Sequence, residues 1–267
     1  MSEQGLVLSG SAPGRPALRP YARRLAVYRE DHGGPLARVQ PAATDAVLIL
    51  GFAAPMEVGG RRLTSFGAGT SDRFTRTRMT APTEGVQIDL TPFGARRLFG
   101  MPLRELANLA VPAEDLLGRW AVEAAERLAA APSWPERLAL AERLLAGRLA
   151  AGPEPDPEVR WAWARLLESG GTVPVASLAG SLRRSHRHLV SRFHDQVGLT
   201  PKAAARVIRF HRAAGLLRSG TAIAEVAATC GYYDQAHMNR DFRALGAITP
   251  GQISPRPPAA RRPTLAS

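Results

Sequence analysis

The chain has 267 residues, of which 45% are hydrophobic and 22% charged, so its composition is that of a folded protein and excludes a disordered one. Its length favours two domains, and the single cysteine, Cys230, excludes an intramolecular disulfide and gives no metal-ligand pattern. Residues 1–157 hold 19 basic and 17 acidic residues, whereas residues 158–267 hold 16 basic and 6 acidic ones. The C-terminal part is therefore expected to bind a polyanion, although charge alone does not distinguish DNA, RNA and an anionic membrane.

The first 18 residues are rich in Gly, Ser and Pro and show no hydrophobic period, which predicts a mobile arm. No basic start is followed by an apolar stretch, so we expect no signal peptide. No run approaches the roughly 20 apolar residues that a membrane span requires. These features favour a cytoplasmic protein with no membrane partner.

Residues 19–150 are predicted to form one α+β domain, β-rich at first and closed by a pair of helices. From about residue 20 to 92, short apolar stretches alternate with Gly and Pro, which is typical of strands and turns. We expect two of these stretches, residues 46–53 and 86–90, to enclose a small apolar pocket. From residue 92 the hydrophobic period becomes helical, and Ser133 is expected to cap the second helix of the pair. These helices are expected to form either a wall of the pocket or a dimer surface.

Residues 151–157 contain three prolines in five positions, which a helix cannot accommodate, so they predict a linker. The remainder divides into an all-α domain over residues 158–254 and a Pro/Arg-rich, disordered tail over residues 255–267.

The first of two helix-turn-helix units is predicted over residues 175–197. Ser185 is expected to cap its second helix, in which Leu189 and Phe193, one turn apart, point inward. The cap and the opposite face present the candidate DNA-contacting residues of this unit: Ser185, His186, Arg187, Val190, Ser191 and His194.

The second unit repeats this pattern over residues 222–244. Asp234 is the expected N-cap, Met238 and Phe242 are the inward anchors, and Tyr232 and Tyr233 are expected to pack rather than contact DNA. Gln, Asn and Arg side chains can read base edges in the major groove. The candidate DNA-contacting residues here are Asp234, Gln235, Ala236, Asn239, Arg240 and Arg243.

These two segments carry a family resemblance. The sequence SHRHLVSRFHDQVGLTPK (residues 185–202) and, more specifically, IAEVAATCGYYDQAHMNRDF (residues 223–242) resemble the two halves of the AraC/XylS-type regulator domain. The resemblance covers about residues 158–253 and implies a seven-helix domain in which a helix over residues 201–217 joins the two units. It also implies a sequence-specific transcription regulator that binds double-stranded DNA. Ser191 departs from the Arg common at its position, and residues 245–250 shift the usual Gly-x-Thr-Pro register by one.

The N-terminal domain is similar to the β-rich sensory domains of a poorly characterised group of bacterial regulators, on the sequence FGARRLFGMPL (residues 93–103) and the helical pair that follows. This similarity implies a small-molecule effector or a homodimer. RNA polymerase is a further partner expected of such a regulator, whether it activates or represses.

Two other classes of function fit the sequence less well. An enzyme would require a Gly-rich phosphate loop, a nucleophile elbow or a Cys/His pair, and none of these occurs. A metalloenzyme would require several histidines in the N-terminal domain, where only His32 is available. We therefore expect no catalysis, no metal and no cofactor. A non-specific nucleic-acid binder would not need the amides of Gln235 and Asn239 aligned on one helix face.

Overall fold

The computed structural model describes residues 6–12 and 18–253. The predicted tail, residues 255–267, lies outside this part of the chain, as do residues 1–5 and 13–17 of the predicted arm. Within that arm, residues 6–12 form strand β1 (Leu6–Ala12), which pairs with β2 (Ala22–Asp31) along its whole length. This segment therefore differs from the arm without regular structure that its composition predicts.

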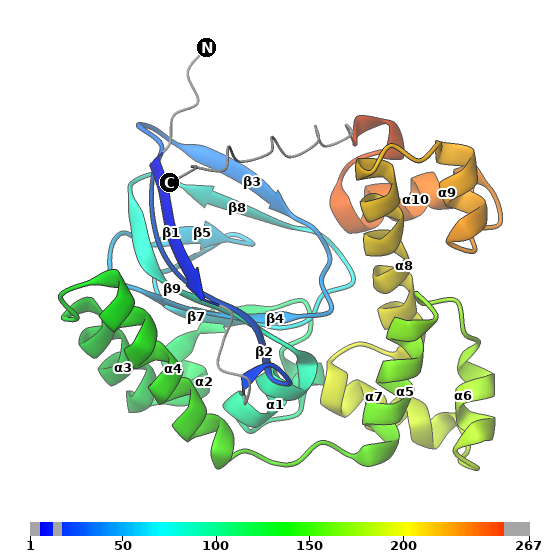
Figure 1. The fold of residues 1–267 in the computed structure, drawn as a ribbon, viewed down its shortest axis with the longest axis horizontal. Coiled ribbons are helices and arrows are strands. Elements are labelled where there is room, and N and C mark those ends of the chain that lie inside the picture. Colours follow the sequence, from blue (N-terminus) through cyan, green and yellow to red (C-terminus); the bar gives the residue numbers. More distant parts are fainter. Residues whose placement is uncertain (1–5, 13–17, 254–267) are drawn as a thin grey trace, which may run out of the picture.

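Two antiparallel sheets face each other in the N-terminal half (Figure 1). The six-stranded sheet has the order β1-β2-β9-β4-β7-β10 and the four-stranded sheet the order β3-β8-β5-β6. Their remaining strands are β9 (Thr83–Leu90), β4 (Ala46–Gly51), β7 (Phe66–Ala68), β10 (Ala110–Pro112), β3 (Leu36–Gln40), β8 (Thr75–Met79), β5 (Met56–Val58) and β6 (Arg61–Leu63).

The central strands β4 and β9 are covered on both faces, which explains why β4 is a continuous apolar run and not an alternating one. On one face Leu48 and Leu50 join a core shared with the helices. On the other face Ile49 joins a second core, with Tyr28 and Phe66, that faces the four-stranded sheet.

Helices cover the face of the six-stranded sheet that lies away from the four-stranded one (Figure 1). Ser133 caps the longest of them, accepting a hydrogen bond from the Glu136 amide at 3.4 Å, as predicted. Because these helices lie behind the sheet, the expectation that they could wall the pocket is wrong. The elements of this layer are α1 (Pro92–Phe99), η2 (Leu103–Glu105), α2 (Ala113–Leu117), α3 (Arg119–Ala129) and α4 (Trp134–Ala150).

The C-terminal part is all helical, as predicted. Residues 157–253 form six α-helices and one 3₁₀ helix, which agrees in number with the seven that the resemblance implies. They are α5 (Pro157–Glu168), α6 (Val175–Ser181), α7 (His186–Val197), α8 (Pro201–Arg218), α9 (Ile223–Thr229), α10 (Gln235–Gly246) and η3 (Pro250–Gln252).

The core of this helical part includes two residues from the N-terminal half. Ala42, in the loop after β3, is fully buried among the C-terminal helices. Phe93 of α1 lies edge-on to Trp163 of α5, with the ring centroids 6.5 Å apart. An ion pair between Arg104 and Asp195 crosses the same boundary. The two halves therefore share part of one core.

Candidate DNA-binding surface and ligand cavity

Helix α7 is the second helix of the first helix-turn-helix unit. Ser185 caps it by accepting a hydrogen bond from the His188 amide at 3.2 Å, and Leu189 and Phe193 are buried beneath it, as predicted. Gly198 ends the helix in the left-handed conformation, at a φ of 86°. Of the candidate contacts, four are exposed and Val190 and His194 are half-buried; the exposed four are Ser185, His186, Arg187 and Ser191.

Helix α10 has the same construction in the second unit. Asp234 caps it by accepting a hydrogen bond from the His237 amide at 2.6 Å, and Met238 and Phe242 are fully buried. Asn239 is half-buried, and the other candidate contacts are exposed: Asp234, Gln235, Ala236, Arg240 and Arg243. The shifted register after this helix leaves Ala247 in the left-handed conformation, at a φ of 53°. Gly246 lies inside α10, where a Cβ would come within 2.9 Å of the Phe210 ring.

The arginines of this domain divide into those with a carboxylate partner and those without one. In the first group Arg165 pairs with Glu168, Arg184 with Glu158, Arg192 with Asp156 and Arg206 with Asp241, at 2.6–2.9 Å. Asp241 is buried, so its pair fixes α8 to α10. The second group, which includes Arg187, Arg240 and Arg243 on the exposed faces of α7 and α10, has no ion-pair partner among the described residues. These three side chains are available to phosphates or bases.

The surface contains one exposed aromatic residue, Tyr233, that was predicted to pack. Tyr232 is buried, but Tyr233 is 92% exposed, so the prediction that both pack is wrong for Tyr233. Tyr233 lies immediately before the N-cap of α10. At this N-terminal end of the helix, the first backbone amides have no partner within the helix and point outward. No local pattern identified it, because two adjacent tyrosines in a turn look alike in the sequence.

Helix α8 joins the two units, as the resemblance implies. It begins after Thr200, whose hydroxyl accepts a hydrogen bond from the Ala203 amide at 3.2 Å, and continues for 18 residues. At about 1.5 Å per residue it spans about 27 Å. The two units lie at opposite ends of it in Figure 1.

Two comparisons identify the class of this domain. Residues 178–256 match the family model described as a helix-turn-helix domain. The HTH-type transcriptional regulator MtrA of Neisseria gonorrhoeae is 30% identical over 79 residues, which are 29% of this chain and 26% of that protein. The match thus spans about a quarter of the relative's length. Residues 178–256 therefore form a helix-turn-helix domain, and the two motifs within and beside this range resemble the AraC/XylS type.

Solved structures also resemble the chain. The C-terminal domain of AraT, a response regulator from Geobacillus stearothermophilus, is 25% identical and covers 38% of this chain and 86% of its own, with a TM-score of 0.36. ToxT from Vibrio cholerae is 11% identical and covers 85% of this chain and 95% of its own, with a TM-score of 0.47.

A cavity of about 1190 Å³ lies between the two sheets. Ile49, Val58 and Phe66 give it an apolar region, but of residues 86–90 only the polar Gln87 and Asp89 line it, so the prediction of a small apolar pocket enclosed by residues 46–53 and 86–90 is wrong. Its polar region contains ion pairs between Arg23 and Asp45, between Arg24 and Asp89 and between Arg38 and Glu30, at 2.7–2.8 Å. Burial raises the pKa of the Asp45 carboxyl, although Arg23 opposes the shift. The cavity thus offers both apolar and charged groups to a ligand.

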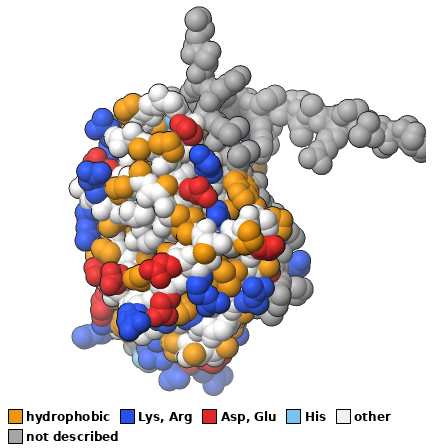
Figure 2. Space-filling model, turned by 90° about the vertical axis from the view of Figure 1, so that its left-hand side faces the viewer, with side chains coloured by type: hydrophobic (Ala, Val, Ile, Leu, Met, Phe, Trp, Pro, Cys, Tyr) orange, Lys and Arg blue, Asp and Glu red, His pale blue; other side chains and the backbone are white. Residues whose placement is uncertain are grey.

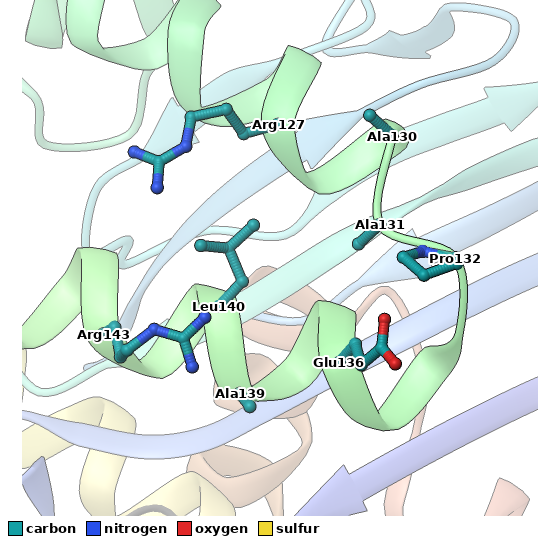
Figure 3. A pocket seen from close by; sticks show the side chains of 8 residues that line it. All are labelled: Arg127, Ala130, Ala131, Pro132, Glu136, Ala139, Leu140 and Arg143. Carbon is teal, nitrogen blue, oxygen red and sulfur yellow. The ribbon is translucent and has the colours of Figure 1, made fainter.

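The N-terminal half also has a smaller groove, of about 430 Å³, between α3 and α4 (Figure 3). Leu140 projects from α4 toward α3, and alanines form much of the remaining lining. On the face of the molecule that carries these helices, basic and acidic side chains are interspersed (Figure 2), in keeping with the near-neutral charge of residues 1–157. This face has no continuous positive surface that would favour a nucleic acid.

Among the described residues, no helix combines the length and the apolar character needed to cross a membrane.

Proposed function

We propose that the chain is a sequence-specific transcription regulator in which residues 158–254 bind double-stranded DNA and residues 19–150 control that binding. The observation that carries this proposal is the pair of capped helices, α7 and α10, which expose polar side chains and unpaired arginines above fully buried aromatic anchors. Structural arginines would be expected to have carboxylate partners, as Arg184 and Arg192 do.

In the proposed complex, the N-terminal turns of α7 and α10 enter successive major grooves, which lie about 34 Å apart along one face of DNA. Gln235 and Asn239 read base edges, and Arg187 has the same role from the first turn of α7. Arg240 and Arg243 lie about one and two turns after Gln235 on α10, and they hold phosphates. His186 and His194 lie near phosphates as well.

The N-terminal domain acts by binding and not by chemistry in this proposal. The cavity between the sheets takes a small-molecule effector, which shifts the protein toward or away from its DNA-binding arrangement only as far as its affinity for the two arrangements differs. Operator DNA must then change the affinity for the effector by the same factor.

Two protein partners complete the proposal. A second copy of the chain would pair through the exposed surface of α3 and α4, where Val122 of α3 is exposed. Comparison of the sedimentation of the full chain with that of its Val122→Glu variant tests this. RNA polymerase is the second partner, and its involvement would place the protein in the bacterial cytoplasm.

Selection of bound sequences from random duplex DNA by the full chain, at stated salt concentrations, tests the function. We expect two half-sites about 10–10.5 base pairs apart, with affinity that falls steeply as salt rises. The double variant Arg187→Ala, Arg240→Ala should lose most of the affinity, whereas Arg62→Ala, an exposed arginine on β6, should not. A folded chain that selects no sequence, or binding unchanged by insertion of about five base pairs between the half-sites, contradicts the two-unit mechanism.

A further inference from the structure

Two loops of the N-terminal half meet at a single antiparallel bridge between Ala43 and Ser71. The Ala43 amide donates to the Ser71 carbonyl at 3.0 Å, and the Ser71 amide donates to the Ala43 carbonyl at 2.7 Å. The Ser71 hydroxyl also accepts a hydrogen bond from the Ala43 amide at 3.1 Å. Because three hydrogen bonds join them, the loop after β3 and the loop after β7 are expected to move together.

The loop that contains Ala43 holds the second helix-turn-helix unit. Ala42 is fully buried in the C-terminal core, and its amide donates to the Leu245 carbonyl, in the last turn of α10, at 2.7 Å. The Ala42 carbonyl accepts a hydrogen bond from Nε2 of His211, on α8, also at 2.7 Å. The loop after β3 thus contacts the carboxyl end of one recognition helix and the helix that links the two units.

The loop that contains Ser71 holds the first helix-turn-helix unit. The hydroxyl of the fully buried Thr70 donates to the carbonyl of Val197, the last residue of α7, at 2.9 Å. Gly198 lies so close that a Cβ there would be 2.3 Å from the Thr70 hydroxyl oxygen. The carboxyl ends of both recognition helices are therefore held by neighbouring residues of one bridge.

The residues of the bridge itself line the cavity. Successive residues of extended chain point to opposite sides. Ala42 and Thr70 accordingly contact the helical domain, whereas Ala43 and Ser71 belong to the cavity wall, together with Asp45. A molecule in the cavity would touch the same two loops that hold α7 and α10.

We propose that the Ala43–Ser71 bridge is the coupling element between the cavity and the DNA-binding surface, setting the relative placement of α7 and α10. This inference rests on the proposed function, since it describes how an effector in the cavity would reach both recognition helices at once. A shift of the bridge displaces both carboxyl ends and so alters the spacing of the two reading units, while each unit keeps its own cap, anchors and outward face.

Amide hydrogen exchange of the full chain tests the coupling without DNA or effector. Thr70→Val removes the hydrogen bond to Val197 and keeps the side-chain shape. It should speed exchange at least fivefold at the end of α7 and also in the last turn of α10, which Thr70 does not contact. Thr80→Val, the same change at an exposed position, is the control and should leave both ends unchanged. Faster exchange at the end of α7 alone would overturn the proposal.

A second variant covers the case in which Thr70→Val unfolds the chain. The double substitution Ala43→Cys, Ser71→Cys allows a disulfide to close the bridge covalently. Oxidation should slow exchange at the ends of both α7 and α10 relative to the reduced protein, and slowing at one end or at neither contradicts the coupling. A chain that shows the coupled exchange but selects no DNA sequence would refute the proposed function and leave the coupling standing.

Discussion

The two helix-turn-helix units have equivalent scaffolds but different recognition faces. In the turn of the first unit, the Arg184 amide donates to the Ala179 carbonyl at 3.1 Å, and in the second the Tyr232 amide donates to the Ala227 carbonyl at 3.0 Å. The residue before each donor is left-handed, but it is Arg183 in the first unit and Gly231 in the second. The second turn then has one extra residue, the exposed Tyr233.

Alignment of the buried anchors, Phe193 with Phe242, brings the outward faces into register. His186 corresponds to Gln235, Val190 to Asn239, and Ser191 to Arg240. Amides and a second-turn arginine thus stand in the second unit where an imidazole, an isopropyl group and a hydroxyl stand in the first. In the proposed complex we therefore expect the second unit to contact more bases than the first, in which Arg187 is the main candidate for base reading and the other contacts are to the DNA backbone.

The largest expected effect tests whether the two scaffolds are equivalent. Phe193→Ala and Phe242→Ala each leave a cavity beneath a recognition helix and should each lower the free energy of unfolding by about 3–5 kcal/mol. Urea denaturation measures both, with the exposed Val122→Ala as the control. A difference of more than about 2 kcal/mol between the two phenylalanine variants would show that the scaffolds are not equivalent.

The next effect tests the difference between the faces. Gln235→Ala and Asn239→Ala should weaken binding by about 1–3 kcal/mol at particular base pairs and relax the preference there. Val190→Ala, at the position equivalent to Asn239, should leave base preference unchanged. Competition with single-base variants of the selected duplex measures this. A uniform loss over all sequences from the amide variants would show that the amides are merely solvated.

Salt dependence separates the paired arginines from the unpaired ones. Arg240→Ala should reduce the slope of log K against log salt concentration by about 1, because one phosphate contact is lost. Arg192→Ala should leave the slope unchanged, since Arg192 pairs with Asp156. Titrations at several salt concentrations measure both slopes, and equal reductions would refute the division of the arginines into two groups.

The smallest effect concerns the ends of the two helices. Ala247 takes the left-handed conformation that Gly198 takes in the first unit, and a side chain disfavours that conformation. Ala247→Gly should therefore stabilise the chain by about 0.5–1 kcal/mol. Ala244→Gly, in the last turn of the same helix, where the backbone is right-handed, should destabilise the chain. Thermal unfolding of the two variants checks the opposite signs.

The structural features that the sequence predicts correctly are those that depend on residues close together in the chain. The caps Ser185 and Asp234, their buried anchors and the linker helix all follow from patterns within a few turns, and the structure confirms them. Features that depend on distant pairing were not predicted. Strand β1 exists because it pairs with β2. Arg192 is structural because it pairs with Asp156, which lies 36 residues before it in the sequence. The polar half of the cavity was missed for the same reason, since its ion pairs join residues of different strands and loops.

The edge-on contact between Phe93 and Trp163 has a consequence for how the chain unfolds. A helical domain produced without the N-terminal half would expose the Trp163 ring and lack the methyl group of Ala42 in its core. We therefore expect a single calorimetric transition for the full chain, with equal calorimetric and van't Hoff enthalpies. For a protein built this way, loss of the N-terminal half through proteolysis should lower the melting temperature of the helical part that remains.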